Sequence, residues 1–255
     1  MEFKDKIALV TGAASGIGQA TCIRLLKSGA KVIMVDISKD LEHHVAKMSF
    51  CNMIKPIVAD VTSESVVQSL VVESERTFGK IDILINCAGV HYGAGKSIMD
   101  FPDEVWDRLH NVLFKGTLYT CKHIAPIMIK NNYGRIINVS SIAGKIARPF
   151  GAPYSCPKAA VIHFTRILAL ELAKYNITVN AIAPGPTKTP LFMSTKKPTL
   201  QEKIEGNKEF FRIGIPNKRL AEPEEQADVI AFLALEKTRH ITGQTIFVDG
   251  GESAV

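Results

Sequence analysis

Short apolar runs rich in β-branched residues alternate along the chain with amphipathic stretches of ten to fifteen residues. Such runs are typical of buried strands, and the stretches between them are typical of helices. Strands are predicted at 6–12, 31–36, 53–61, 81–89, 135–141, 178–185 and 244–251. Helices are predicted up to Lys27 and at 40–49, 64–78, 104–130, 154–174 and 223–234. This order indicates βαβ units with right-handed crossovers, and therefore an α/β fold with a parallel sheet.

The composition favours one domain over residues 1–255, with no linker, internal repeat or low-complexity segment. Because there is no run of eighteen apolar residues and the N-terminus leads into a strand without a signal-peptide pattern, we expect a soluble, cytoplasmic protein. The five cysteines are scattered and never form a CxxC pair. A disulfide framework or a zinc site is therefore not expected.

Most of the net charge of +6 comes from one segment, residues 187–219, which contains eight positive and three negative residues. The positive residues are Lys188, Lys196, Lys197, Lys203, Lys208, Arg212, Lys218 and Arg219, and the negative ones are Glu202, Glu205 and Glu209. The excess forms neither an arginine-rich helix nor a basic arm, so nucleic-acid binding is only a minor alternative.

A glycine-rich turn, TGAASGIGQA, lies between the first strand and the first helix and contains Gly12, Gly16 and Gly18. Glycines let the backbone turn sharply and approach a ligand, and free amides at a helix start favour a pyrophosphate. The spacing GxxxGxG differs from the usual dinucleotide fingerprint, and a simple tight turn is the alternative interpretation.

Asp36 ends the second strand, where a carboxylate can hydrogen-bond a ribose 2′-hydroxyl and repel a 2′-phosphate. Neither Ser15 nor Ile37 offers a positive charge, so NAD is favoured over NADP, although Lys39 is near in the sequence. A solvated residue at a strand end is the other interpretation of Asp36.

Tyr154 and Lys158 are four residues apart at the start of a predicted helix, so their side chains share one face. Ser141 follows a predicted strand and can meet the phenol. An ammonium near a phenol lowers the phenol's pKa, which suits proton transfer to or from a substrate oxygen.

Together these motifs resemble the short-chain dehydrogenase/reductase family, in its classical type, over essentially the whole chain. They are TGAASGIG, Asp36, Asp60 with Val61, NCAG at 86–89, Ser141, YSCPK at 154–158 and PGPTKT at 184–189. The resemblance implies a single Rossmann-like, doubly wound domain with a seven-stranded parallel sheet. It also implies a nicotinamide cofactor and hydride transfer between that cofactor and an alcohol or carbonyl.

By this resemblance Tyr154 exchanges the proton, Ser141 positions the substrate oxygen, and Lys158 lowers the tyrosine pKa and holds the nicotinamide ribose. The other residues implied to bind the cofactor are Gly12, Ser15, Gly16, Ile17, Gly18, Asp36, Asp60, Val61, Asn86, Ala88, Gly89, Pro184, Gly185, Thr187 and Thr189. Turn chemistry is the alternative for several of them.

One departure from the family lies in WDRLHNVLFKG, where Leu113 stands at the place of the family's asparagine and Asn111 comes two residues earlier. Either the helix is deformed so that Asn111 serves, or the water-mediated proton path from Lys158 lacks this member. We favour the second interpretation.

Two smaller departures are Pro157 and Cys87. Proline is tolerated in a first helical turn, so the helix is expected to begin close to Tyr154. Cys87 is expected to be a buried, inert thiol.

The predicted function is NAD-dependent hydride transfer to or from a secondary alcohol or ketone. A 3-oxoacyl-thioester reductase and a non-catalytic NAD-binding protein remain as alternatives. Residues 187–219, with Phe192, Phe210 and Phe211, are interpreted as a basic lid that could favour an anionic substrate, and a solvated surface is the other reading. His91, Tyr92 and residues 145–150 could line the pocket, and the resemblance suggests a homotetramer or homodimer.

Overall fold

The computed structural model describes residues 1–91, 96–194, 199–208 and 211–254. Within these residues it contains a seven-stranded sheet with the order β3-β2-β1-β4-β5-β6-β7, and every neighbouring pair is parallel. The strands are β1 (Ile7–Thr11), β2 (Lys31–Asp36), β3 (Ile54–Val58), β4 (Ile83–Asn86), β5 (Gly134–Val139), β6 (Ile177–Pro184) and β7 (Thr245–Val248). The predicted single α/β domain with a parallel sheet is confirmed.

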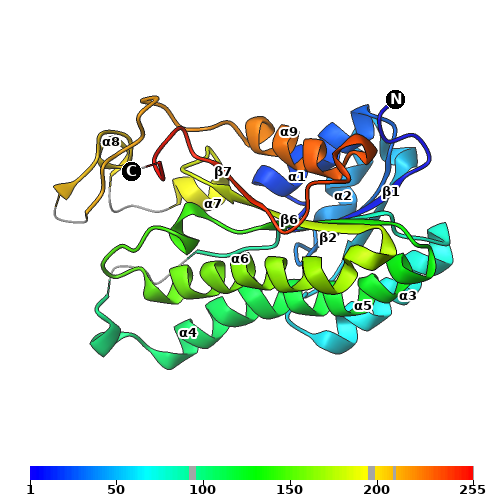
Figure 1. Cartoon of the computed structure of the whole chain (residues 1–255), viewed down its shortest axis with the longest axis horizontal. Helices are drawn as coiled ribbons and strands as arrows, with labels where there is room; N and C mark the ends of the chain where they lie inside the picture. Colours follow the sequence, from blue (N-terminus) through cyan, green and yellow to red (C-terminus); the bar gives the residue numbers. More distant parts are fainter. Residues whose placement is uncertain (92–95, 195–198, 209–210, 255) are drawn as a thin grey trace.

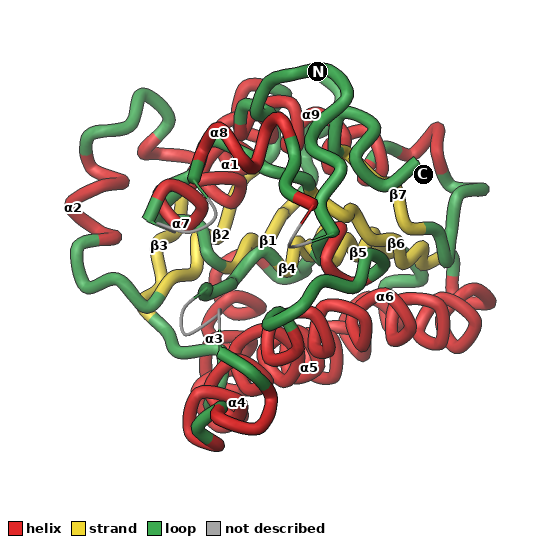
Figure 2. The backbone as a smooth tube through the Cα atoms, turned by 90° about the vertical axis from the view of Figure 1, so that its left-hand side faces the viewer, coloured by secondary structure: helices red, strands yellow, loops and turns green. Residues whose placement is uncertain are grey.

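Helices cover both faces of this sheet (Figure 1). They are α1 (Gly16–Lys27), α2 (Leu41–Ala46), α3 (Glu64–Phe78), α4 (Asp103–His110), α5 (Gly116–Lys130), α6 (Ala152–Leu172), α7 (Pro190–Met193), α8 (Leu200–Glu205) and α9 (Pro223–Ala234). Figure 2 shows α3, α5 and α6 below the strands and α1 and α9 above them. Short 3₁₀ turns occur at Cys51–Met53, Ile98–Asp100, Ile142–Gly144, Ala173–Tyr175 and Glu236–Thr238.

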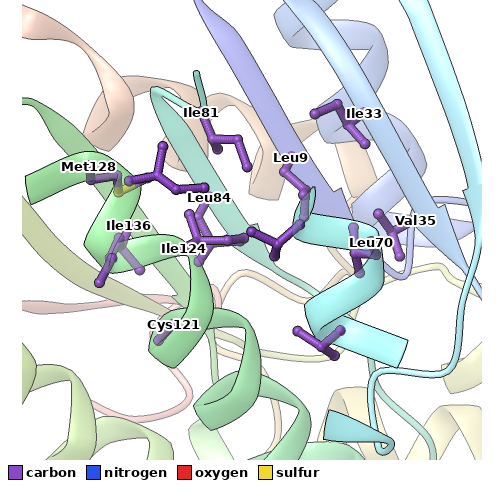
Figure 3. Packing of buried hydrophobic residues seen from close by; sticks show 14 of the residues in the cluster. Leu9, Ile33, Val35, Leu70, Ile81, Leu84, Cys121, Ile124, Met128 and Ile136 are labelled. Atoms are coloured by element: carbon purple, nitrogen blue, oxygen red, sulfur yellow. The ribbon is translucent and has the colours of Figure 1, made fainter. Parts of the chain in front are cut away.

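Two apolar layers hold the helices to the sheet. In one layer, side chains of β1, β4 and β5 meet those of α3, α5 and α6, as Leu9, Leu70, Leu84 and Ile124 illustrate (Figure 3). The other layer packs the opposite side of the strands against α1, α2 and α9. Because the sheet is covered on both faces, all residues of β1 and β4 are buried, which explains their uninterrupted apolar sequences.

The order of the strands reverses between β1 and β4, because the chain builds the sheet outward in both directions from these two strands. In doubly wound sheets, ligands bind beyond the carboxyl ends of the strands at such a switch point. The residues that follow β1, β2, β4, β5 and β6 are therefore the first place to examine for a site.

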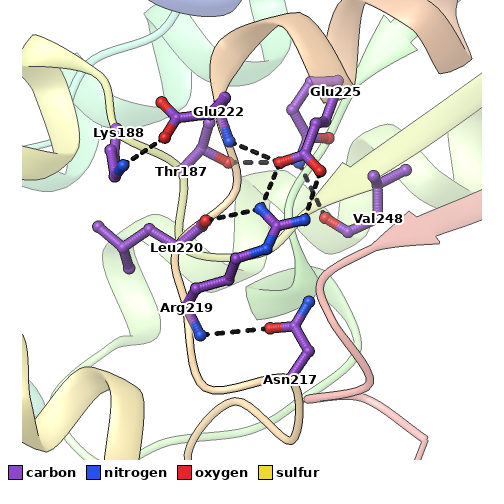
Figure 4. A network of polar contacts seen from close by, with 9 residues as sticks. Thr187, Lys188, Asn217, Arg219, Leu220, Glu222, Glu225 and Val248 are labelled. Atoms are coloured by element: carbon purple, nitrogen blue, oxygen red, sulfur yellow. Dashed lines mark hydrogen bonds and ion pairs between the residues drawn. The ribbon is translucent and has the colours of Figure 1, made fainter.

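Residues 187–219, the segment predicted to be a lid and called the lid below, leave the sheet after β6 and return before α9. The two ends of the lid are joined by backbone bonds from Lys188 N to Ala221 O (2.9 Å) and from Ala221 N to Pro186 O (3.0 Å). Arg219 adds two bonds to the carboxylate of Glu225, at 2.7 and 2.6 Å (Figure 4). We call this junction the lid neck, and it fixes where the lid starts and ends.

Across the part of the chain that the structure describes, no helix is long and apolar enough to cross a membrane. No group of three metal-ligating side chains occurs within the same residues.

Candidate active site

The glycine-rich turn after β1 is too tight for side chains. Gly12 and Gly16 have φ of +66° and +53°, and a Cβ on Gly18 would lie 2.1 Å from the carbonyl oxygen of Gly12. A Cβ on Gly12 would lie 2.8 Å from the Cα of Ala88, so the turn also presses against the segment that follows β4. All three predicted glycines are therefore required by the geometry of the turn.

The start of α1 is open to an anion. Ser15 is the N-cap residue, in an extended conformation, and its hydroxyl caps no amide of the helix. The first amides of the helix, around Ile17, have no intrahelical acceptor, and the first turn carries no acidic residue. These features match a pyrophosphate at the helix N-terminus.

Asp36 links the end of β2 to the glycine-rich turn. Its Oδ2 accepts the amide of Ala14 (2.9 Å), and its Oδ1 accepts the amide of Ser38 (3.0 Å). The adjacent Ile37 side chain is 67% exposed, so this strand end faces outward beside the turn. A carboxylate held in this way can accept further bonds from a ribose.

Asp60 and Val61 shape the turn between β3 and α3. Asp60 Oδ1 accepts both the amide and the hydroxyl of Thr62, each at 2.8 Å. The Val61 side chain is buried, and a Cβ on Gly116 would lie 2.8 Å from its Cγ2. The side chain thus belongs to the core, which leaves the backbone of Val61 for any contact with an adenine.

Asn86 lies at the end of β4, with its side chain in the protein interior. Its Nδ2 donates to Asn138 Oδ1 (2.9 Å), and its Oδ1 accepts the Thr120 hydroxyl (2.6 Å). Asn138 in turn donates to the hydroxyl of Thr165 on α6 (2.9 Å). This buried network, named the Asn86 network below, joins β4, β5, α5 and α6 directly beneath the site.

The segment after Asn86 returns to β1. The amides of Cys87 and Ala88 both donate to the Thr11 hydroxyl at 3.1 Å. A Cβ on Gly89 would lie 3.6 Å from Leu113 Cδ2, so this glycine faces the helical segment that carries Leu113. Ala88 and Gly89 therefore line the edge of the sheet between the glycine-rich turn and that helical segment.

Ser141, Tyr154 and Lys158 converge beyond the end of β5. The Ser141 hydroxyl accepts the amide of Ala143 (3.2 Å) and lies close enough to the Tyr154 phenol to lower its pKa. Lys158 is 4% exposed, and its Nζ lies 6.0 Å from the centre of the Tyr154 ring and donates to Val139 O (2.8 Å). The predicted trio is thus assembled in one place.

The ionisation of this trio differs from the prediction. Burial disfavours the phenolate and raises the pKa of Tyr154, against a smaller lowering effect of the Ser141 hydrogen bond. Burial also lowers the pKa of the Lys158 ammonium to about 8. The prediction that Lys158 lowers the tyrosine pKa is wrong for this geometry, since the ammonium is directed at the Val139 carbonyl and lies 6.0 Å from the ring centre.

The predicted long helix at 104–130 is interrupted. Between α4 and α5 the residues Asn111–Lys115 form a π-helix, a local deformation that often marks functional sites. Leu113 is 1% exposed and faces Gly89. Among the described residues, Asn111 makes no hydrogen bond to Lys158. The helix is therefore deformed, yet an apolar side chain occupies the predicted relay position, as our favoured interpretation requires.

The start of α6 also differs from the prediction. The helix begins at Ala152, two residues before Tyr154, and its first turn contains Pro153. Pro157 thus lies in the second turn, where a proline cannot donate a bond to the carbonyl four residues earlier. Cys87 is partly exposed rather than fully buried as predicted, and desolvation raises the pKa of its thiol to about 12, which keeps it protonated.

The segment after β6 forms the other wall. Pro184 ends β6, and a Cβ on Gly185 would lie 2.7 Å from the Cα of Asp249. Buried Thr187 accepts a bond from Gln226 (3.3 Å).

Thr189 closes this wall against the glycine-rich turn. Its hydroxyl caps α7 by accepting the amide of Phe192 (3.1 Å). Its Cγ2 lies 3.0 Å from the position of a Cβ on Gly16. The PGPTKT segment therefore meets the glycine-rich turn.

Of the residues proposed to line the substrate pocket, His91 reaches the site. Its ring lies edge-on to the Tyr154 ring, with 4.8 Å between the centroids and 63° between the planes. Phe211 is mostly exposed. Tyr92, Phe210, Lys196, Lys197 and Glu209 lie outside the described residues.

The sequence analysis missed Glu252, whose carboxylate pairs with Arg148 and Arg212. A lone glutamate near the end of a chain has no spacing that would single it out.

The comparisons with known proteins agree with this geometry. The family model described as Enoyl-(Acyl carrier protein) reductase matches residues 12–253. The chain is 39% identical over 253 residues to the 3-oxoacyl-[acyl-carrier-protein] reductase FabG of Thermotoga maritima, covering 98% of this chain and 99% of the relative.

Two solved structures are also similar. Levodione reductase superposes with a TM-score of 0.90 at 30% identity, covering 99% of both chains. The 3-ketoacyl-(acyl-carrier-protein) reductase of Brucella melitensis, complexed with NADH, has a TM-score of 0.88 at 32% identity and covers 98% of this chain and 99% of its own.

The chain belongs to the short-chain dehydrogenase/reductase family. It is accordingly an oxidoreductase that acts on CH–OH groups with a nicotinamide cofactor as the hydride partner.

Proposed function

We propose that this protein catalyses the NAD-dependent interconversion of a secondary alcohol and a ketone, with Tyr154 as general acid and base. The observation that carries the proposal is the convergence of Ser141, Tyr154 and Lys158 beyond β5, next to a turn suited to a pyrophosphate. A nicotinamide bound there supplies hydride acceptance and donation at its C4 carbon.

The chain's own residues handle the proton and the geometry. When an alcohol is oxidised, its hydroxyl proton passes to Tyr154 in its phenolate form, while the Ser141 hydroxyl positions the reacting oxygen by a hydrogen bond. In the reverse direction the phenol donates its proton to the developing alkoxide. The raised pKa of Tyr154 keeps the phenol protonated near neutral pH, a state ready for ketone reduction.

Lys158 has a positioning role in this proposal. Its ammonium is tied to the Val139 carbonyl just before Ser140 and Ser141, so it holds the end of β5 against α6. From this position it is also suited to hold the nicotinamide ribose, as in the family. The remaining proposed cofactor contacts are those of the glycine-rich turn, Asp36 and the PGPTKT segment.

NAD is proposed over NADP because of Asp36. Both of its oxygens are fixed by amides of the neighbouring turns, so the carboxylate cannot easily turn away from a 2′-phosphate. The Brucella melitensis structure with NADH supports this choice. Lys39 is exposed next to Asp36 and is the residue that could weaken the preference.

The decisive experiment follows cofactor absorbance at 340 nm with a panel of secondary alcohols and ketones. Tyr154→Phe should lose at least ~10²-fold in turnover, the usual effect of removing a general acid and base, and should still bind NAD in calorimetry. Wild-type turnover by Tyr154→Phe would refute the role of the phenol. NAD binding without turnover of any substrate by the wild type would instead support a non-catalytic NAD-binding protein.

A 3-oxoacyl-thioester reductase is a second candidate function. It is supported by the 39% identity to the Thermotoga maritima FabG protein and by the similar Brucella melitensis reductase. Acetoacetyl thioesters and simple ketones compared at equal concentration distinguish the two functions. A thioester preference of less than about tenfold in kcat/KM would leave the general alcohol dehydrogenase as the better description.

We also propose a homotetramer or homodimer, located in the cytoplasm. Helix α6 exposes Ile167 and Leu170, three residues apart on one face, with Leu170 83% exposed, and a second copy could cover this apolar strip. A monomeric mass in light scattering would contradict the oligomer. The five free cysteines fit a reducing compartment, and recovery of the protein outside the cytosolic fraction would contradict the location.

A further inference from the structure

Three segments that are distant in the sequence meet at one buried carboxylate. Glu252, near the C-terminus, is fully buried, and its Oε1 binds Arg148 at 2.5 Å and Arg212 at 3.2 Å. Arg148 belongs to the loop between Ser141 and Tyr154, whereas Arg212 belongs to the lid. We call Arg148 and Arg212 the arginine pair.

Hydrogen bonding in this cluster is incomplete. The Nε atoms of both arginines and the Oε2 of Glu252 are buried without a bonding partner among the described residues. Two guanidinium groups thus share a single carboxylate oxygen, although each has a fork of donors suited to a whole carboxylate or phosphate. A cluster built only to hold the lid in place would be better satisfied by two-pronged contacts.

Positive charge exceeds negative charge around the pair. Burial and the charge of Arg212 lower the pKa of Lys203, and burial together with the charge of Arg148 lowers the pKa of Arg212. Among the described residues, Asp249 also acts on Glu252, and its oxygens accept the amides of Gly251 (3.0 Å) and Ser253 (2.8 Å).

The loop that carries Arg148 leads from Ser141 to Tyr154, two members of the candidate trio. Lys203, buried on the lid with its ammonium 4.4 Å from the Phe192 ring centre, is close enough to lower the pKa of His91. His91 in turn packs edge-on against Tyr154. Lys203 therefore interacts electrostatically both with His91, which contacts the phenol ring, and with Arg212 of the arginine pair.

We propose that Arg148 and Arg212, held side by side by Glu252, bind an anionic group, a carboxylate or a phosphate, at the end of the substrate remote from its hydroxyl. The inference rests on the proposed alcohol dehydrogenase function and names the substrate class for it: hydroxy or oxo compounds with a terminal anion. Arginine suits this task because its planar fork matches both anions and its charge is permanent.

The test uses a series of hydroxy acids of increasing length, 3-hydroxybutyrate, 4-hydroxypentanoate and 5-hydroxyhexanoate, each compared with its uncharged amide. At the chain length that spans the site, wild-type kcat/KM should favour the acid by at least roughly tenfold, as expected for a hydrogen-bonded charged contact. Hydroxyalkyl phosphates compared with plain secondary alcohols form a second arm, which distinguishes phosphate from carboxylate.

Arg212→Met should lose the preference for the anion and keep turnover of the amides. Lys208→Met is the matched control, since it removes a positive charge from an exposed position of the same lid and should keep the preference. Arg212→Lys retains the charge without the fork and should keep part of the preference. Equal losses for acids and amides in Arg212→Met, or no anion preference in the wild type, would overturn the proposal.

A binding measurement separates this proposal from the proposed function. Inorganic phosphate should raise the thermal unfolding midpoint of the wild type and of Lys208→Met more than that of Arg212→Met. Phosphate bound at the glycine-rich turn contributes equally to all three proteins and cancels in the comparison. If no substrate is turned over, the alcohol dehydrogenase function fails, yet a phosphate effect that depends on Arg212 still supports the anion site, and an equal effect in all three overturns it.

Discussion

The Asn86 network gives the sharpest prediction about what holds the site together. Asn138 Nδ2 donates to the Thr165 hydroxyl at 2.9 Å, and that hydroxyl donates to Val161 O at 2.8 Å. Both Asn138 and Thr165 are 0% exposed. Thr165→Val keeps the shape of the side chain and removes only the hydroxyl, so it leaves the Asn138 amide without an acceptor in the core.

The expected cost follows from burial. A buried donor left unsatisfied costs about 1–3 kcal/mol, and Thr165→Val creates almost no cavity that could add to this. Thr165→Ser is the matched control, because it keeps the hydroxyl and loses one methyl group, worth about 0.8 kcal/mol. The valine variant should therefore be the less stable of the two.

Urea unfolding followed by circular dichroism measures the difference. The midpoint should fall in the order wild type, Thr165→Ser, Thr165→Val, with an unchanged m value, since the surface exposed on unfolding stays the same. Because the network underlies the end of β5, NAD-dependent turnover of Thr165→Val should fall while the protein stays folded. Stability of Thr165→Val within about 0.5 kcal/mol of the wild type would show that Asn138 finds another partner, and the network argument would fail.

Two further predictions concern charge. The folded-state pKa of Lys158, about 8, lies below its ordinary 10.5, so the unfolded chain binds more protons between these values and wild-type stability rises with pH there. Lys158→Met should thus be more stable than the wild type at pH 7, by roughly 3 kcal/mol. The difference in unfolding free energy between the two proteins, measured by urea unfolding, should shrink from pH 8 to 10. A difference that stays constant with pH would contradict a desolvated ammonium. Asp36→Ala should improve NADP affinity relative to NAD by roughly tenfold or more in fluorescence titration, because a repulsive carboxylate is lost. The exposed Asp40→Ala serves as its control, and an unchanged ratio in Asp36→Ala would exclude Asp36 as the discriminating residue.

Local signals account for the parts of the fold that were predicted well. Short apolar runs rich in β-branched residues placed all seven strands of the described sheet, and β1, β4, β5 and β6 are buried along their whole length. Helix α3 ends at Phe78 as predicted, because Gly79 adopts φ of +75° and terminates it. Helix α9 begins at Pro223 as predicted, where a proline suits the first turn.

The prediction that the candidate catalytic residues lie close together also came from local sequence patterns. Ser141 follows a predicted strand, and Tyr154 and Lys158 share one face of a predicted helix. Their ionisation was not predictable in the same way. Desolvation depends on every element packed around the phenol and the ammonium, and no spacing along the chain reports it. The predicted lowering of the tyrosine pKa is therefore the part that the geometry does not bear out.

The remaining misses are long-range. The π-helix at Asn111–Lys115 has no turn signal in its sequence. The contacts of Glu252 with Arg148 and Arg212 join residues separated by 104 positions in one case and by α9 and β7 in the other. Contacts of this kind exist only once the sheet has brought its carboxyl ends together.

The lid neck has a consequence for how this enzyme could change its substrate. Because Lys188 and Ala221 are already bonded at the point where the lid leaves the body of the protein, residues between them can be replaced, lengthened or shortened without altering the strands that carry the reacting groups. Transplanting the corresponding segment from a relative with another specificity, joined at these two residues, should yield a folded hybrid whose substrate preference follows the donor. Mutations in the lid could then change substrate recognition without changing the residues that carry out the reaction.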